Sequence, residues 1–181
     1  MADVELWLVR HGETERSRDG ILAGWADIPL TVRGEDQARS LRGLLADNSF
    51  ASAWSSDLQR TARTAALAWG EAPPEPRLRE ANFGHLEGVP WRALPPSVLG
   101  PIDAFRGFAF PGGETEAVVW SRVCGFVSSL PAGRHLLFTH GGVIRLLTRE
   151  AGLDEFLPTA SVAVMTWPGR RLLAVHRAGG N

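Results

Sequence analysis

Residues 6–14 read Leu6-Trp7-Leu8-Val9-Arg10-His11-Gly12-Glu13-Thr14, an apolar run that stops at a cation, an imidazole and a glycine. With Val4, the apolar part predicts a buried strand over residues 4–9. Ligands of open α/β sheets bind just outside the carboxyl ends of the strands. Arg10 offers a planar cation for phosphate or carboxylate, and His11 a nitrogen that can attack or carry protons near neutral pH. An isolated Arg-His-Gly tripeptide is more often an ordinary strand end, so the rest of the chain has to support this site.

Composition limits the classes of function. The chain has 181 residues, which predicts a single domain over 1–181 with a full apolar core. The lone Cys124 cannot form an intrachain disulfide and favours a reducing compartment. A net charge of −1, from mixed acidic and basic residues, gives no field for nucleic acid or an anionic membrane. The acidic start of the chain argues against a signal peptide, and a cytoplasmic location is expected, while a homodimer is left open.

Strands and helices alternate along the chain. Apolar patterns predict strands over 4–9, 50–54, 135–139, 162–167 and 172–176, and helices over 33–46, 58–69, 114–129 and 142–150. The last two strands should form a hairpin. This order predicts an α/β fold of three layers, with a mostly parallel central sheet and helices on both faces. Residues 77–111 are rich in Gly and Pro and predict an irregular insertion over the active site.

Polar clusters follow three of the predicted strands: Arg10-His11-Gly12, Ser55-Ser56-Asp57-Leu58-Gln59-Arg60 and Thr139-His140-Gly141-Gly142. Parallel strands would bring these ends to one edge of the sheet. A phosphate would be held together by Arg10, Arg60, His11, His140 and the free backbone amides at the start of the helix predicted over 142–150. A metal would need more ligands than two histidines, and the two arginines would repel it, so no metal is expected.

In this setting, the chain resembles the histidine phosphatase superfamily, the phosphoglycerate mutase-like branch that works through a phosphohistidine. The resemblance runs along nearly the whole chain and rests on motifs in the family's order. These are residues 10–14, Gly24-Trp25-Ala26-Asp27-Ile28-Pro29-Leu30-Thr31, Gly34, Gln37-Ala38, residues 55–65, Leu78-Arg79-Glu80, Phe83-Gly84, Glu87-Gly88, Pro111-Gly112-Gly113-Glu114 and residues 139–143. It implies a phosphoglycerate mutase-like fold.

The resemblance also implies that no cofactor takes part and that individual residues have defined catalytic roles. His11 would be the nucleophile, kept neutral and oriented by a backbone carbonyl near Gly12. Arg10, Arg60 and His140 would surround the phosphoryl group and neutralise its charge. Glu80 would protonate the leaving group and then deprotonate the attacking water, and Glu87 and Glu13 compete for this role.

Two positions depart from the family pattern. Ser17 stands where members often carry Asn, and a hydroxyl reaches less far toward phosphate. Ala23 stands where Ser or Thr is common. Substrate binding would therefore depend more on Gly24 and Trp25, beside Ser17 and Gly141, and Trp91 is a further pocket candidate.

The short insertion favours a phosphatase that admits water to a small-molecule phosphomonoester. It resembles the α-ribazole-5′-phosphate phosphatase and broad-specificity phosphatase groups, and its apolar side chains would suit a ring-bearing organic phosphate. The alternatives are a cofactor-dependent phosphoglycerate mutase and a non-catalytic phosphate-binding regulatory module.

Overall fold

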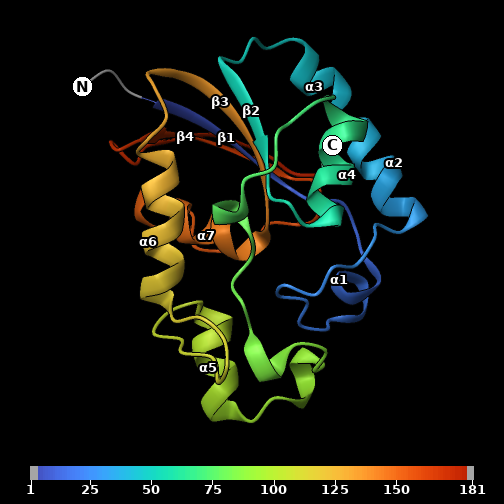
Figure 1. The fold of residues 1–181 in the computed structure, drawn as a ribbon, viewed down its shortest axis with the longest axis vertical. Coiled ribbons are helices and arrows are strands. Elements are labelled where there is room, and N and C mark those ends of the chain that lie inside the picture. Colours follow the sequence, from blue (N-terminus) through green and yellow to red (C-terminus); the bar gives the residue numbers. More distant parts are fainter. Residues whose placement is uncertain (1–3, 179–181) are drawn as a thin grey trace.

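Strand β1 (Val4–Arg10) occupies the centre of a five-stranded sheet with the order β2-β3-β1-β4-β5 (Figure 1). The structure is a computed structural model that describes residues 4–178. The other strands are β2 (Ser52–Ser55), β3 (Gly133–Thr139), β4 (Val162–Trp167) and β5 (Leu172–His176). β1 and β2 each pair in parallel with β3, whereas β4 is antiparallel to β1 and β5 to β4. The sheet is therefore mixed, and the predicted parallel arrangement holds for β2, β3 and β1.

The unbroken apolar run of β1 follows from burial on both faces of the sheet. Leu6 and Leu8 belong to one apolar cluster, and Trp7 and Val9 belong to a second cluster. Successive side chains of a strand point to opposite faces, so each cluster lies on its own side of the sheet. All four side chains are buried. The predicted three-layer arrangement is confirmed.

Helices α2, α3 and α4 cover one face of the sheet and α6 and α7 the other (Figure 1). Within residues 4–178, no helix is both long and apolar enough to cross a membrane. The α-helices are α1 (Glu15–Asp19), α2 (Val32–Ser40), α3 (Arg42–Ala46), α4 (Gln59–Ala68), α5 (Pro96–Ala104), α6 (Glu116–Val127) and α7 (Gly141–Thr148). Short 3-10 helices are η1 (Pro76–Leu78), η2 (Gly84–Leu86), η3 (Trp91–Ala93) and η4 (Arg149–Ala151).

Two predictions need correction. The helix expected over 33–46 is broken at Leu41, which separates α2 from α3. The segment expected to be irregular contains α5 and three 3-10 helices. The prolines of this segment favour irregular structure, but Pro96 stands in the first turn of α5, where a proline loses no hydrogen bond and fits the helical φ. Ile102 of α5 and Phe105 after it are buried in the core, which anchors the insertion over the carboxyl edge of the sheet.

Candidate active site

The predicted strand ends meet at one edge of the sheet. Arg10 at the end of β1 is in register with Thr139 at the end of β3, and the adjoining Ser55 of β2 is in register with Phe138. The residues that follow these strands therefore lie together, and the centres of the His11 and His140 rings are 5.3 Å apart.

A cavity of about 230 Å³ opens at this edge. Seven of the predicted site residues line it: Arg10, His11, Ser17, Gly24, Arg60, Glu80 and Gly141. Trp25 and His140 are not among the residues that line it. The cavity is also lined by Thr14, Arg16, Gly20, Ile21, Leu22, Ala23, Phe83, Trp91, Gly142 and Phe156. The charged groups thus share a small space with an apolar wall.

The ring of His11 is held in one tautomer. Its Nδ1 lies 2.7 Å from the carbonyl oxygen of Gly12, which can only accept, so Nδ1 carries the proton and Nε2 keeps its lone pair. Burial, together with the positive charges of Arg60 and Arg10, lowers the pKa of His11 well below its usual range. His11 is therefore a neutral imidazole at pH 7, with the unprotonated nitrogen that a nucleophile requires.

The turn that carries His11 depends on two glycines in close contact. A β-carbon on Gly12 would collide with the backbone carbonyl of Gly34 at the start of α2, and a β-carbon on Gly34 would collide with the backbone of Glu13. Thr31 caps α2 by accepting a hydrogen bond from Gly34 N at 3.0 Å. The start of α2 is thereby packed directly against the nucleophile turn.

Arg60 is fully buried in the first turn of α4 and fixes the loop over the cavity. Its guanidinium donates to the carbonyl oxygens of Gly24 at 2.7 Å and Ala26 at 2.8 Å. Its Nε donates to Nδ1 of His140 at 3.3 Å. Burial lowers the pKa of Arg60 to about 10, so it remains a cation at neutral pH. It offers a fixed positive charge to an anion in the cavity.

His140 is fully buried and hydrogen-bonded to Arg60. Because Arg60 Nε can only donate, Nδ1 of His140 accepts and Nε2 carries the proton toward the Ser56 hydroxyl at 2.9 Å. Burial and the charge of Arg60 lower the pKa of His140 well below its usual range. His140 thus supports Arg60 here, and its predicted contact with a phosphoryl group stays a prediction.

Only some of the hydrogen-bond donors of the Arg10 guanidinium have a partner. One of its terminal nitrogens donates to the carbonyl oxygen of Leu157, whereas its Nε is buried without a hydrogen-bond partner among residues 4–178. Burial lowers the pKa of Arg10, and the Coulombic attraction of Glu80 opposes this shift. Gly141 leaves room for the guanidinium, since a β-carbon there would lie 3.2 Å from Arg10 Cζ. Arg10 lines the cavity as a second cation beside Arg60.

Glu80 faces the same cavity. Its two carboxylate oxygens accept hydrogen bonds from the backbone amides of Gly142 and Ala81, each at 3.0 Å. The Gly142 amide was predicted to be free for phosphate, and this is corrected: the carboxylate of Glu80 occupies it. The anion-binding capacity of this helix start instead holds an acidic side chain beside His11.

The two competing carboxylates lie elsewhere. Glu87 accepts a hydrogen bond from the backbone amide of Trp25 at 2.7 Å, and Glu13 accepts one from the Thr31 hydroxyl at 2.9 Å. Neither residue lines the cavity. Among the predicted acids, Glu80 is the one that lines the cavity together with His11.

The predicted substrate-binding side chains of Ser17 and Trp25 form hydrogen bonds within the protein. The Ser17 hydroxyl donates to the Thr14 carbonyl at 3.0 Å and accepts from the Thr14 amide at 2.9 Å, which caps α1. The Trp25 indole donates to the backbone oxygen of Glu80 at 2.8 Å and lies against the Arg79 guanidinium. Trp25 therefore positions the segment that carries Glu80.

Sequence reasoning missed Arg16 and Phe156. Arg16 adds a third arginine to the lining, and Phe156 contributes an aromatic ring from the loop after η4. Arg16 resembles any exposed charge on a short helix, and Phe156 lies outside every quoted motif, so neither carries a local signal. Across residues 4–178, no three His, Cys, Asp or Glu side chains come together in a way that could hold a metal.

Comparisons with known proteins agree with this geometry. A family model for the histidine phosphatase superfamily (branch 1) matches residues 6–176. Fructose-2,6-bisphosphatase TIGAR B of Danio rerio is 32% identical over 187 residues, which cover 98% of this chain and 72% of the relative. The adenosylcobalamin/alpha-ribazole phosphatase of Escherichia coli (strain K12) is 35% identical over 156 residues, which cover 80% of this chain and 77% of the relative.

A solved structure extends the likeness to three dimensions. The crystal structure of phosphoglycerate mutase from Thermus thermophilus is 47% identical and matches with a TM-score of 0.89, covering 95% of this chain and 98% of that one. The family match spans nearly all of the described fold, including the cavity that holds His11. The chain belongs to the histidine phosphatase superfamily.

Proposed function

We propose that the protein is a metal-independent phosphomonoesterase that forms a phosphohistidine on His11 and uses Glu80 as general acid and base. One observation carries this proposal: the neutral His11, with its Nδ1 proton held by Gly12, shares a small cavity with Arg10, Arg60 and Glu80. A nucleophile, two fixed cations and a carboxyl group are the components of phosphoryl transfer.

The reaction would proceed in two displacements. His11 Nε2 attacks phosphorus, the P–O bond to the substrate alcohol breaks, and Glu80 gives its proton to the departing oxygen. Glu80, now a carboxylate, takes a proton from water, whose oxygen attacks the phosphohistidine and breaks the P–N bond. Inorganic phosphate leaves and both residues are restored. Arg10 and Arg60 would stabilise the negative charge on the transferring oxygens in both steps.

The walls of the cavity support a small organic phosphate as substrate. Leu22, Phe83, Trp91 and Phe156 present apolar surface beside the charged groups. Such a wall suits a ring-bearing alcohol attached to the phosphate. The alpha-ribazole phosphatase among the relatives supports α-ribazole-5′-phosphate as the first candidate to test.

A phosphoglycerate mutase is the second candidate function, because the Thermus thermophilus structure carries that name. A mutase must return the phosphoryl group to its substrate, whereas a phosphatase passes it to water. The site differs from a non-catalytic phosphate-binding module in keeping both a neutral His11 and the carboxyl group of Glu80 in one cavity.

Trapping the intermediate tests this proposal. Acid-sensitive, alkali-stable label from a radiolabelled phosphomonoester should appear on the wild-type protein and be absent from His11→Ala. Labelling that survives in the variant would refute His11 as nucleophile. α-Ribazole-5′-phosphate and 3-phosphoglycerate should then be assayed in EDTA for free phosphate against isomerised product. Dominant isomerisation would favour the mutase, and a loss of turnover reversed by added metal would contradict metal independence.

A further inference from the structure

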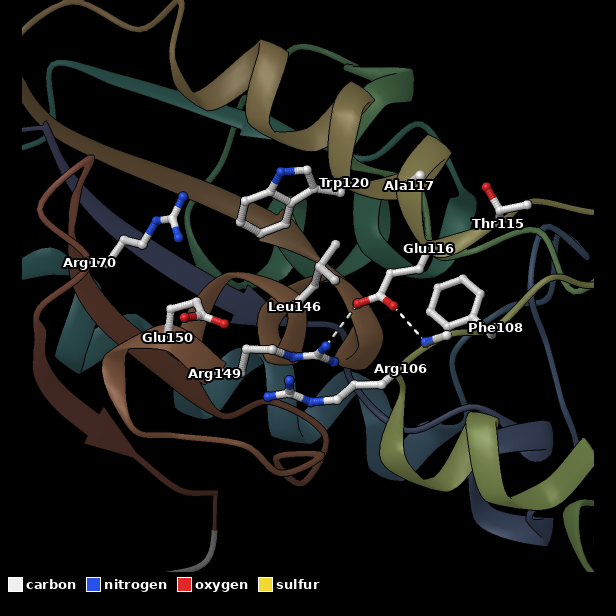
Figure 2. Close-up of a pocket in the computed structure, with 11 residues that line it drawn as sticks. Arg106, Phe108, Thr115, Glu116, Ala117, Trp120, Leu146, Arg149, Glu150 and Arg170 are labelled. Carbon is white, nitrogen blue, oxygen red and sulfur yellow. Dashed lines mark hydrogen bonds and ion pairs between the residues drawn. The ribbon is translucent and has the colours of Figure 1, made fainter.

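A second and larger cavity, of about 560 Å³, lies between α6, α7 and the loop that follows α5 (Figure 2). None of the residues assigned to the phosphate cavity lines it. Its apolar wall is formed by Phe108, Trp120 and Leu146, of which Phe108 and Leu146 are buried. The proposed phosphatase reaction gives this cavity no role.

Aromatic and cationic groups adjoin in its wall. The guanidinium of Arg170 lies 5.2 Å from the centre of the Trp120 ring and 5.4 Å from that of Trp167. Trp120 and Arg170 both line the cavity. Planar guanidinium and indole groups of this kind can stack on a further flat ring.

Arg149 brings a buried cation to the wall of the cavity. Its side chain is only 5% exposed, and it donates to the Glu116 carboxylate at 2.9 Å and to the carbonyl oxygen of Phe105. The other carboxylate oxygen of Glu116 accepts from the Gly107 amide at 2.6 Å. Figure 2 marks the contact between Arg149 and Glu116. Arg149 Nε is buried and has no hydrogen-bond partner within residues 4–178.

Positive charge is in excess around Arg149. Asp154 is shared between Arg145 at 2.7 Å and Arg106 at 3.3 Å, so three arginines face two carboxylates here. Burial and the nearby charge of Arg106 lower the pKa of Arg149, in keeping with an uncompensated positive potential.

One acidic side chain opposes this excess. Glu150 also lines the cavity, but it is exposed and, like Arg170, forms no ion pair in the described part of the chain. Its charge should balance that of Arg170. The unbalanced positive charge therefore lies on the side of Arg106 and Arg149.

We propose that this second cavity is a binding site for a small molecule that combines a planar aromatic ring with one anionic group. The ring lies against Trp120 and Phe108, and the anion accepts hydrogen bonds from the Arg106 guanidinium, near the positive charge of the buried Arg149. A carboxylate, sulfonate or phosphate would meet the same donors. Such a ligand would offset the local excess of positive charge.

Calorimetric titration with two matched probes tests this site. Naphthalenesulfonate carries the required charge and cannot be hydrolysed as a phosphomonoester, and naphthalenesulfonamide has nearly the same shape but is neutral. We expect the sulfonate to bind with one-to-one stoichiometry and the sulfonamide to bind about tenfold more weakly, as expected for loss of a charge-assisted hydrogen bond. Equal binding of the two probes, or no binding of the sulfonate, would overturn the proposal.

Variants locate the bound probe. Arg106→Gln should weaken sulfonate binding about tenfold, Glu150→Gln should strengthen it, and Arg171→Gln should leave it unchanged. Arg171 is the matched control because it is an exposed neighbour of Arg170 outside the cavity. Equal affinities of the Arg106 and Arg171 variants would refute the site.

A variant of the phosphate cavity separates the two sites. Arg16 lines the phosphate cavity and not the second one, so Arg16→Gln should leave sulfonate binding unchanged. Weaker binding in this variant would place the probe in the phosphate cavity and overturn the second site, whereas a failed phosphohistidine experiment would leave the binding result standing.

Discussion

The carboxylate of Glu80 accepts a hydrogen bond from the backbone amide of Gly142, 3.0 Å away in the first turn of α7. The Glu80 backbone oxygen in turn accepts from the Trp25 indole at 2.8 Å and from Arg122 at 2.8 Å. Glu80 is therefore held at both its side chain and its main chain, although it lies in the loop after η1. This anchoring fixes the distance between the proposed acid and the nucleophile.

Glu80→Gln should lower kcat by about 10²- to 10⁴-fold while leaving KM nearly unchanged, provided that substrate binding equilibrates before chemistry. The amide oxygen can still accept from Gly142, but the group can no longer give or take a proton. Steady-state kinetics of phosphate release would measure the change. Glu87→Gln is the control, since its carboxylate binds the Trp25 amide outside the cavity. Near-normal turnover of the Glu80 variant would transfer the role to Glu87 or Glu13.

Arg60→Lys should weaken inhibition by inorganic phosphate and destabilise the protein by about 2–4 kcal/mol, because one ammonium cannot replace the donors to Gly24, Ala26 and His140. Urea denaturation and product inhibition measure the two effects. Arg63→Lys, one turn along α4, removes only a half-exposed pair with Glu35 and should have little effect. Similar results for both variants would contradict the assigned role of Arg60.

The free energy of unfolding should fall as the pH falls below about 6.5, the usual pKa of an unfolded histidine. The folded-state pKa values of His11 and His140 lie well below that value, so the unfolded chain binds more protons between the folded and unfolded pKa values. Each histidine should change the free energy of unfolding by up to about 1.4 kcal/mol per pH unit. Urea denaturation between about pH 7.5 and about pH 5.5 would show it. His140→Gln should roughly halve the slope, and an unchanged slope would argue against this origin.

Gly34→Ala should destabilise the protein by about 1–3 kcal/mol and reduce phosphatase activity, because the new methyl group meets the backbone of Glu13 in the nucleophile turn. Gly43→Ala is the matched control, since it lies in α3 with nothing within 4 Å of the added carbon. That control should be stabilising by about 0.5–1 kcal/mol. Thermal unfolding of both variants, with assays, would check the contrast; equal stabilities would refute the close approach of the two backbones.

The sequence predicts the strands well because apolar runs buried on both faces leave a continuous pattern. The strands over 162–167 and 172–176 have the predicted bounds. The antiparallel direction of β4 beside β1 could not be predicted, since apolar pattern carries no information on strand direction. Helix α5 was hidden because Pro96 can either begin a helix or prevent one.

Local motifs likewise placed His11, Arg60 and Glu80 in one cavity, because each follows a strand end or a family pattern. Contacts between segments that are distant in the sequence could not be predicted from local motifs. The use of the Gly142 amide by Glu80 depends on how the insertion folds back onto α7, and Phe156 reaches the cavity through tertiary packing alone.

Every residue of α7 is buried, and this helix begins beside the phosphate cavity and leads through Thr148 to Arg149 of the second cavity. Its eight residues span about 12 Å. A ligand held in the second cavity would therefore stabilise the folded protein from a position that does not compete with substrate. This offers the protein engineer a way to raise thermal resistance by ligand choice while the residues around His11 stay unaltered.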